Sequence, residues 1–173
     1  NTTLKKVSLL KLKPIKKPQT TLTKNQPLNP LWQKRKMMMS HSKIKVLVQS
    51  NYCRMVTGFG KNMKNILLAL HKDPDIEVFE ASNGVPYGRD TGTPWESYGT
   101  YPSNPQILKL IEKEPVKKRA AQYGFYHIDD IVEKVKPDVF LGIEDIWAFR
   151  EYEKKKWWPK TKKIIWTTLD SLP

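Results

Sequence analysis

Cysteine is almost absent from this 173-residue chain, since Cys53 stands alone and no disulfide can form within the chain. The single thiol fits a reducing compartment, and we expect a cytoplasmic protein. The three histidines, His41, His71 and His127, are scattered, so we expect no metal site. The sequence has no apolar run of roughly 18 residues, so no transmembrane segment is expected.

Acidic residues are missing from the first quarter of the chain. Residues 1–43 hold 11 Lys and Arg and no Asp or Glu, whereas residues 44–173 hold 20 Lys and Arg against 17 Asp and Glu. The net charge of +14 therefore belongs mainly to the N-terminal segment. Its Lys-, Thr-, Pro- and Asn-rich composition predicts a disordered basic tail over residues 1–42.

Three interpretations of the basic tail remain open. It can bind nucleic acid or anionic lipid through phosphate contacts. It can be a targeting peptide, although Arg35 is its only arginine. It can also be upstream sequence that is not native coding sequence, because three methionines at positions 37–39 precede the first strand. A start at Met37 would remove 10 positive charges and leave +4.

The remainder, residues 43–173, alternates strand-like and helix-like segments. Such alternation predicts an α/β fold, a Rossmann-like doubly wound parallel sheet. Glycines, prolines and aromatic residues fill positions 83–103, which predicts a long loop. Trp95 in this loop either stacks on a sugar or base or packs the loop onto the domain. Strands are expected at 44–49, 76–81, 139–143 and 163–168, and helices from the glycine turn to Leu70 and at 104–114, 128–135 and 148–158.

A glycine-bearing turn joins the first expected strand to the first expected helix. It contains Thr57, Gly58, Phe59 and Gly60. Backbone N–H groups and the positive end of the helix dipole make such a turn suitable for an anion. The turn is neither G-x-G-x-x-G, because Met63 stands at the third glycine position, nor a P-loop. A tight turn without a ligand is therefore the alternative.

Acidic residues follow two later strands. Glu144 and Asp145 end the apolar run 139–143, and Asp170 follows the last expected strand. The carboxyl ends of parallel strands lie along one edge of the sheet, so we expect these acids to converge with the glycine turn. The alternative for Asp145 and Asp170 is a structural one, in which each caps the start of a helix.

Four segments resemble the N-terminal half of a retaining GT-B glycosyltransferase. They are the strand KIKVLVQS, the turn Thr57-Gly58-Phe59-Gly60, the phrase Lys136-Pro137-Asp138-Val139 and the strand IIWTTLD. The resemblance is to the group that includes glycogen synthases and sucrose synthases, and to glycosyltransferases of large tailed phages. It covers about residues 43–173.

The resemblance implies an acceptor-side domain that transfers a sugar with retention and without a metal or cofactor. The donor would be a sugar nucleotide, and residues 57–60 would approach its diphosphate. Glu144, Asp145 and Asp170 would face the unknown acceptor as the catalytic group. Many members of the family have a histidine just before the aspartate that follows the last strand. In this chain that position is Leu169, which is a departure from the family pattern.

The family's second domain is also missing from this sequence. A diphosphate leaving group needs cationic stabilisation, and only Arg54 and Lys61 lie near the glycine turn in sequence. We therefore expect a truncated and inactive piece of a longer enzyme, with apolar surface facing the lost C-terminal domain.

A second hypothesis comes from another functional class. The domain would be a non-catalytic Rossmann-like binding or assembly module, and the basic tail would hold nucleic acid. Ordering of the tail on RNA or DNA would favour this hypothesis, whereas a downstream nucleotide-binding domain would favour the glycosyltransferase.

Overall fold

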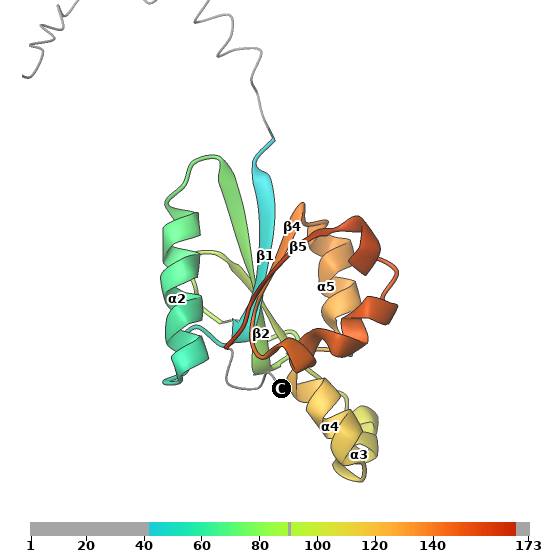
Figure 1. Ribbon diagram of the computed structural model, residues 1–173. Coiled ribbons are helices and arrows are strands. Elements are labelled where there is room, and N and C mark those ends of the chain that lie inside the picture. Colours follow the sequence, from blue (N-terminus) through green and yellow to red (C-terminus); the bar gives the residue numbers. More distant parts are fainter. Residues whose placement is uncertain (1–41, 90, 169–173) are drawn as a thin grey trace, which may run out of the picture. The chain divides into compact units, whose positions relative to one another are not determined.

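A computed structural model describes residues 42–89 and 91–168 (Figure 1). The basic tail up to residue 41, with its three interpretations, and also Leu169 and Asp170, lie outside these residues. The described part contains a five-stranded parallel sheet with the order β3-β2-β1-β4-β5, which confirms the predicted Rossmann-like α/β class. The elements are β1 (Ile44–Asn51), α2 (Gly58–His71), β2 (Ile76–Pro86), β3 (Glu96–Tyr101), α3 (Pro105–Glu112), α4 (Pro115–Gln122), α5 (Ile128–Val135), β4 (Val139–Ile143), two 3₁₀ segments η1 (Ile146–Lys154) and η2 (Trp158–Lys160), and β5 (Lys162–Trp166).

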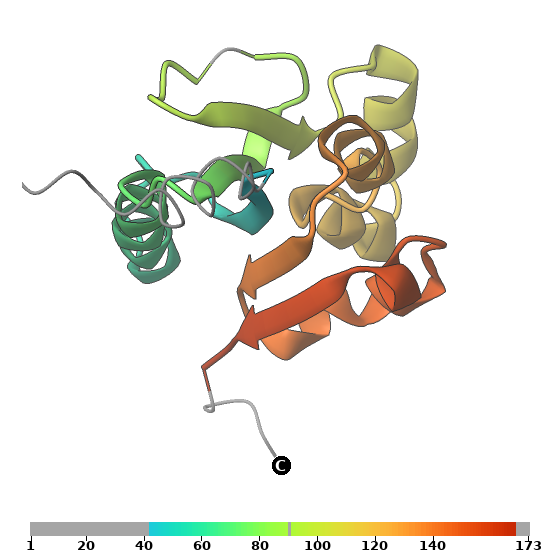
Figure 2. The same cartoon turned by 90° about the horizontal axis from the view of Figure 1, so that it is seen from above.

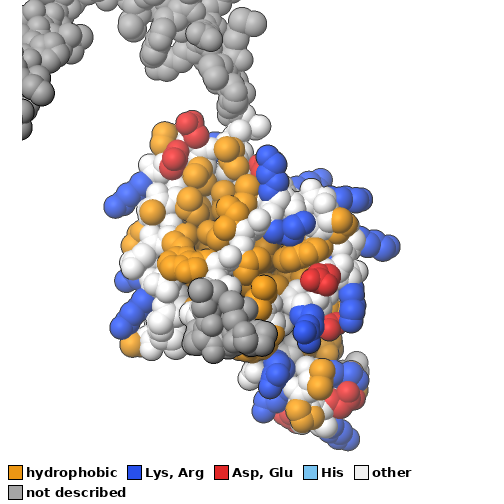
Figure 3. All heavy atoms as spheres, viewed as in Figure 1, with side chains coloured by type: hydrophobic (Ala, Val, Ile, Leu, Met, Phe, Trp, Pro, Cys, Tyr) orange, Lys and Arg blue, Asp and Glu red, His pale blue; other side chains and the backbone are white. Residues whose placement is uncertain are grey.

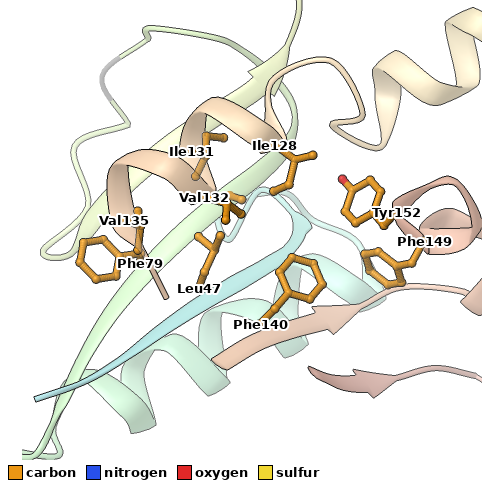
Figure 4. Close-up of a cluster of buried hydrophobic side chains, with 10 residues drawn as sticks. Leu47, Phe79, Ile128, Ile131, Val132, Val135, Phe140, Phe149 and Tyr152 are labelled. Atoms are coloured by element: carbon orange, nitrogen blue, oxygen red, sulfur yellow. The ribbon is translucent and has the colours of Figure 1, made fainter. Parts of the chain in front are cut away.

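The central strand β1 is buried on both faces, as its apolar residues Val46, Leu47 and Val48 predict. Val46 and Val48 face α2 and join Met63 and Leu67 in one cluster. Leu47 faces the opposite layer, which contains α5 and η1. Figure 2 shows these layers on the two sides of the sheet. Figure 4 shows the second cluster, formed by Leu47, Phe79, Ala81, Ile128, Ile131, Val132, Val135, Phe140, Phe149 and Tyr152.

The predicted long loop over 83–103 is wrong in extent. Strand β2 continues to Pro86, and β3 pairs with it in parallel, so only residues 87–95 connect them. Gly99 explains why a glycine-rich segment forms a strand here. A Cβ at this residue would lie 2.1 Å from the carbonyl oxygen of Pro86, so β3 passes where only glycine fits.

The helices differ from the prediction in two places. The helix predicted over 104–114 ends at Glu112 as α3, and Pro115 begins an unpredicted helix, α4, where the missing proline N–H is tolerated in the first turn. The resulting pair α3–α4 projects beyond the carboxyl edge of the sheet (Figure 1). The predicted helix over 148–158 is instead two 3₁₀ segments, η1 and η2.

Apolar side chains are exposed on the α2 side of β4 and β5, as Figure 3 shows. Ile164 and Trp166 are 56% and 48% exposed, and the register pairs them with Leu141 and Ile143 of β4. Because Leu141 and Ile143 belong to the cluster under α2, Ile164 and Trp166 lie on the same face beyond that helix. Within the described residues, no helix is both long and apolar enough to cross a membrane.

Candidate functional site at the carboxyl edge of the sheet

The glycine turn leads directly into α2. Thr57 is the N-cap, and its Oγ1 accepts a hydrogen bond from the Gly60 N–H at 3.0 Å. A Cβ on Gly60 would lie 2.4 Å from the carbonyl oxygen of Met55, so the turn requires glycine there. A Cβ on Gly58 would meet nothing within 4 Å. The two glycines therefore differ, since Gly60 serves close backbone packing and Gly58 leaves open space at the helix start.

Asn51 links this turn to the acidic end of β4. Its backbone N–H donates to Oε1 of Glu144 at 3.0 Å, and its side-chain amide donates to Oγ1 of Thr57 at 3.3 Å. The sheet therefore brings Thr57 and Glu144 together through one intervening residue, as the strand-end argument predicts. Asp170, the third predicted acid, lies outside the described residues.

Glu144 is 2% exposed and is held by internal hydrogen bonds. In addition to the Asn51 N–H, its Oε1 accepts from the side chains of Asn83 at 3.3 Å and Ser50 at 3.5 Å. Burial raises the pKa of its carboxyl group from 4.5 to about 7, against the opposing effect of these donors. Glu144 thus holds Ser50, Asn51 and Asn83 by hydrogen bonds. Its carboxyl group gains or loses its proton near neutral pH.

The raised pKa of Glu144 predicts a pH-dependent stability. Between pH 4.5 and about 7 the folded chain keeps a proton that the unfolded chain has released, so the Glu144 contribution falls as pH rises through this window. Glu144→Gln lacks this titration. Urea unfolding of both proteins should show the wild type losing up to about 3 kcal/mol relative to the variant across the window. A constant difference at every pH would contradict the raised pKa.

Asp145 is half-buried beside Glu144, and its carboxylate accepts a hydrogen bond from Oγ1 of Thr168 at 2.8 Å. It occupies the N-cap position of η1, but its side chain makes no capping hydrogen bond. The prediction that Asp145 caps a helix with its side chain is therefore wrong. Burial raises the pKa of the neighbouring Tyr123, and the negative charges of Glu144 and Asp145 act in the same direction. Asp145 is thus the more accessible of the two acids.

Glu80 is a buried acid that the sequence reasoning missed. It is 0% exposed, and its carboxyl group accepts from the Cys53 N–H at 3.0 Å, the Ser82 hydroxyl at 2.9 Å and the Trp95 indole N–H at 2.8 Å. These bonds tie the β1–α2 loop and the β2–β3 connection to β2. Trp95 packs in the cluster under α2, so its packing interpretation is confirmed. The sequence contained a signal for the burial of Glu80. Residues two apart in a strand face the same side of the sheet, and Val78 packs in the cluster under α2.

A pocket of about 530 Å³ opens beside the glycine turn, between the β1–α2 loop and the β2–β3 connection. Arg54 comes from the first of these segments and Arg89 from the second. Sequence proximity alone identified Arg54 but missed Arg89, because 35 positions separate them. The residues that line this pocket include Tyr52, Arg54, Met55, Gly84, Arg89 and Gly92.

No group of three or more His, Cys, Asp or Glu side chains that could hold a metal ion occurs among residues 42–89 and 91–168. Comparison with known proteins gave no matching family model and no matching curated protein. The case for a function therefore depends on the strand-edge geometry and on the four sequence segments described above.

Proposed function

We propose that the described domain is the acceptor-side domain of a GT-B glycosyltransferase, which moves a sugar from a sugar nucleotide to an acceptor. The observation that carries the proposal is the junction formed by Thr57, Asn51 and Glu144, which places the start of α2 and the acidic end of β4 at one edge. Ligands of parallel α/β sheets bind at this edge. The sequence resemblance supplies the reaction class.

In this proposal the residues have distinct roles. The start of α2 presents its positive dipole end, with Gly58 leaving room for the donor diphosphate. Asp145 accepts a hydrogen bond from an acceptor hydroxyl and orients it. Glu144 is a positioning residue, because its buried carboxyl group holds Asn51 and Asn83 rather than contacting solvent. The remaining cationic stabilisation of the leaving group comes from a second domain.

Saccharide binding by the 173-residue chain tests the proposal without requiring turnover. On a glycan array we expect saturable binding to a restricted set of saccharides. Asp145→Asn should weaken this binding by about tenfold through loss of a charge-assisted hydrogen bond. The variant keeps an oxygen acceptor for Thr168, so its unfolding should change by less than about 1 kcal/mol.

Asp75→Asn is the matched control, because it removes the same charge at the opposite edge, beside the start of β2. It should bind saccharide like the wild type. Failure of the wild type to bind any saccharide would contradict the proposal, and so would equal losses in both variants.

One observation favours the alternative of a non-catalytic binding module with a nucleic-acid-binding tail. Glu80 and Glu144, the two buried acids among the described residues, are both engaged in hydrogen bonds that hold loops. Steeply salt-dependent binding of an RNA or DNA oligonucleotide, without saccharide binding, is the result that this alternative predicts.

A further inference from the structure

The pocket beside the glycine turn is formed by two segments that fold against each other. The hydroxyl of Tyr52 donates to the carbonyl oxygen of Thr91 at 2.9 Å, which joins the β1–α2 loop to the β2–β3 connection. Glu80 strengthens the same junction by accepting from Cys53 in one segment and Trp95 in the other. The pocket walls are therefore fixed by buried hydrogen bonds as well as by loop packing.

Arg54 is held in place by the opposite wall. Its guanidinium donates a hydrogen bond to the carbonyl oxygen of Gly92. Gly92 has a φ of +59°, and a Cβ there would lie 3.8 Å from a terminal nitrogen of Arg54. That distance is an ordinary van der Waals contact, so the positive φ, and not the proximity of Arg54, favours glycine at this position. Because a guanidinium has five N–H donors, this one bond leaves others for a ligand.

Arg54 and Arg89 line the same pocket, one from each of the two segments that form it. Burial raises the pKa of the Tyr52 hydroxyl, while both arginines act on it in the opposite direction. Among the described residues that line the pocket there is no Asp or Glu, and Asp90, which lies between Arg89 and Thr91 in the chain, is outside the described residues. Two exposed arginines that line one pocket can together bind an oxyanion, because each guanidinium can donate two parallel N–H···O bonds.

We propose that this pocket binds an oxyanion, a phosphate or carboxylate, carried by the acceptor. That the ligand is the sugar acceptor rests on the proposed function, whereas the binding of an oxyanion depends only on the residues of the pocket. The site lies next to the turn that begins α2, since Tyr52, Arg54 and Met55 precede Thr57 in the same loop. An acceptor held there by its anionic group would extend its sugar along the carboxyl edge toward Asp145.

Titration of the 173-residue chain with three monosaccharides tests the site, with ¹H–¹⁵N amide spectra as the readout at constant ionic strength. The probes are glucose 6-phosphate, glucuronate and neutral glucose. At least one anionic probe should bind about tenfold more tightly than glucose and shift the amides of Gly84 and Gly92. Preference for glucose 6-phosphate identifies phosphate as the natural group, and preference for glucuronate identifies carboxylate.

The double variant Arg54→Gln/Arg89→Gln should lose this preference, whereas Arg150→Gln, an exposed arginine of η1, should keep it. An unaltered spectrum far from the pocket confirms that the double variant is folded. Equal affinity for anionic and neutral probes, or equal loss in the Arg150 variant, would overturn the oxyanion site. Anion binding without any array signal would leave the site intact and count against the glycosyltransferase, so the two failures are distinguishable.

Discussion

Glu80→Ala is expected to lower the free energy of unfolding by about 4 kcal/mol, because three buried donors lose a charged or polar acceptor at once. Water cannot replace the carboxyl group as the acceptor for the Cys53 N–H and the Trp95 indole N–H, because these residues are only 4% and 8% exposed. Urea denaturation followed by far-UV circular dichroism measures this change. Detaching the β2–β3 connection should also increase cleavage between residues 87 and 95 by a protease under native conditions.

Glu77→Ala is the control for this prediction. Glu77 lies on the same strand but is exposed, so its replacement should change the unfolding free energy by less than about 0.5 kcal/mol. If Glu80→Ala and Glu77→Ala unfold alike, the three hydrogen bonds of Glu80 do not hold the two loops together, and the walls of the arginine pocket lose their structural basis.

Gly60→Ala is expected to be destabilising by about 2 kcal/mol or more, because its Cβ meets fixed backbone and not a side chain that can move. The carbonyl oxygens of Met55 and Tyr52 would lie 2.4 and 3.0 Å from the added carbon. Displacing them disturbs the loop that carries Arg54, so anion binding should weaken together with stability. Thermal unfolding and the glucose 6-phosphate titration on the same sample measure both effects.

Gly58→Ala is the matched control in the same turn. Its Cβ has open space and its φ lies outside the left-handed region, so alanine should leave stability unchanged or raise it by up to about 1 kcal/mol. Comparable losses at both glycines would show that conformational freedom of the turn, and not close packing at Gly60, determines its glycine content.

The sequence predicted the fold class because its strongest patterns act locally. The apolar run of β1 and the helical spacing of Met63 and Leu67 each determine an element without reference to distant residues. Strand β3 was missed because its fit depends on the contact between Gly99 and the end of β2, which only the folded chain contains. The same limit applies to α4, a helix that begins at Pro115 and that the sequence patterns did not indicate.

The candidate site was predictable only as far as strand ends could be located. The common edge of the strand ends predicted that Thr57 lies near Glu144, and the structure shows this. The role of Asn51 in linking them could not be predicted, because it depends on the precise register of β1 beside β4. Arg89 could not be placed beside Arg54, because the predicted loop over 83–103 had no defined path. Burial separates Glu144 from Asp145 although they are adjacent, and no sequence pattern distinguishes their exposure.

Amide mapping of a bound saccharide is the most direct test of whether the carboxyl edge of the sheet binds the acceptor. The 173-residue chain is titrated with the saccharide that gives the strongest array signal, and ¹H–¹⁵N spectra locate it. We expect shifts confined to the carboxyl edge, at Asn51, Gly58, Gly84 and Asp145, and their loss in Asp145→Asn. Shifts confined to the opposite edge, around Asp75, Lys136 and Thr161, or no saturable shift with any saccharide, would contradict it.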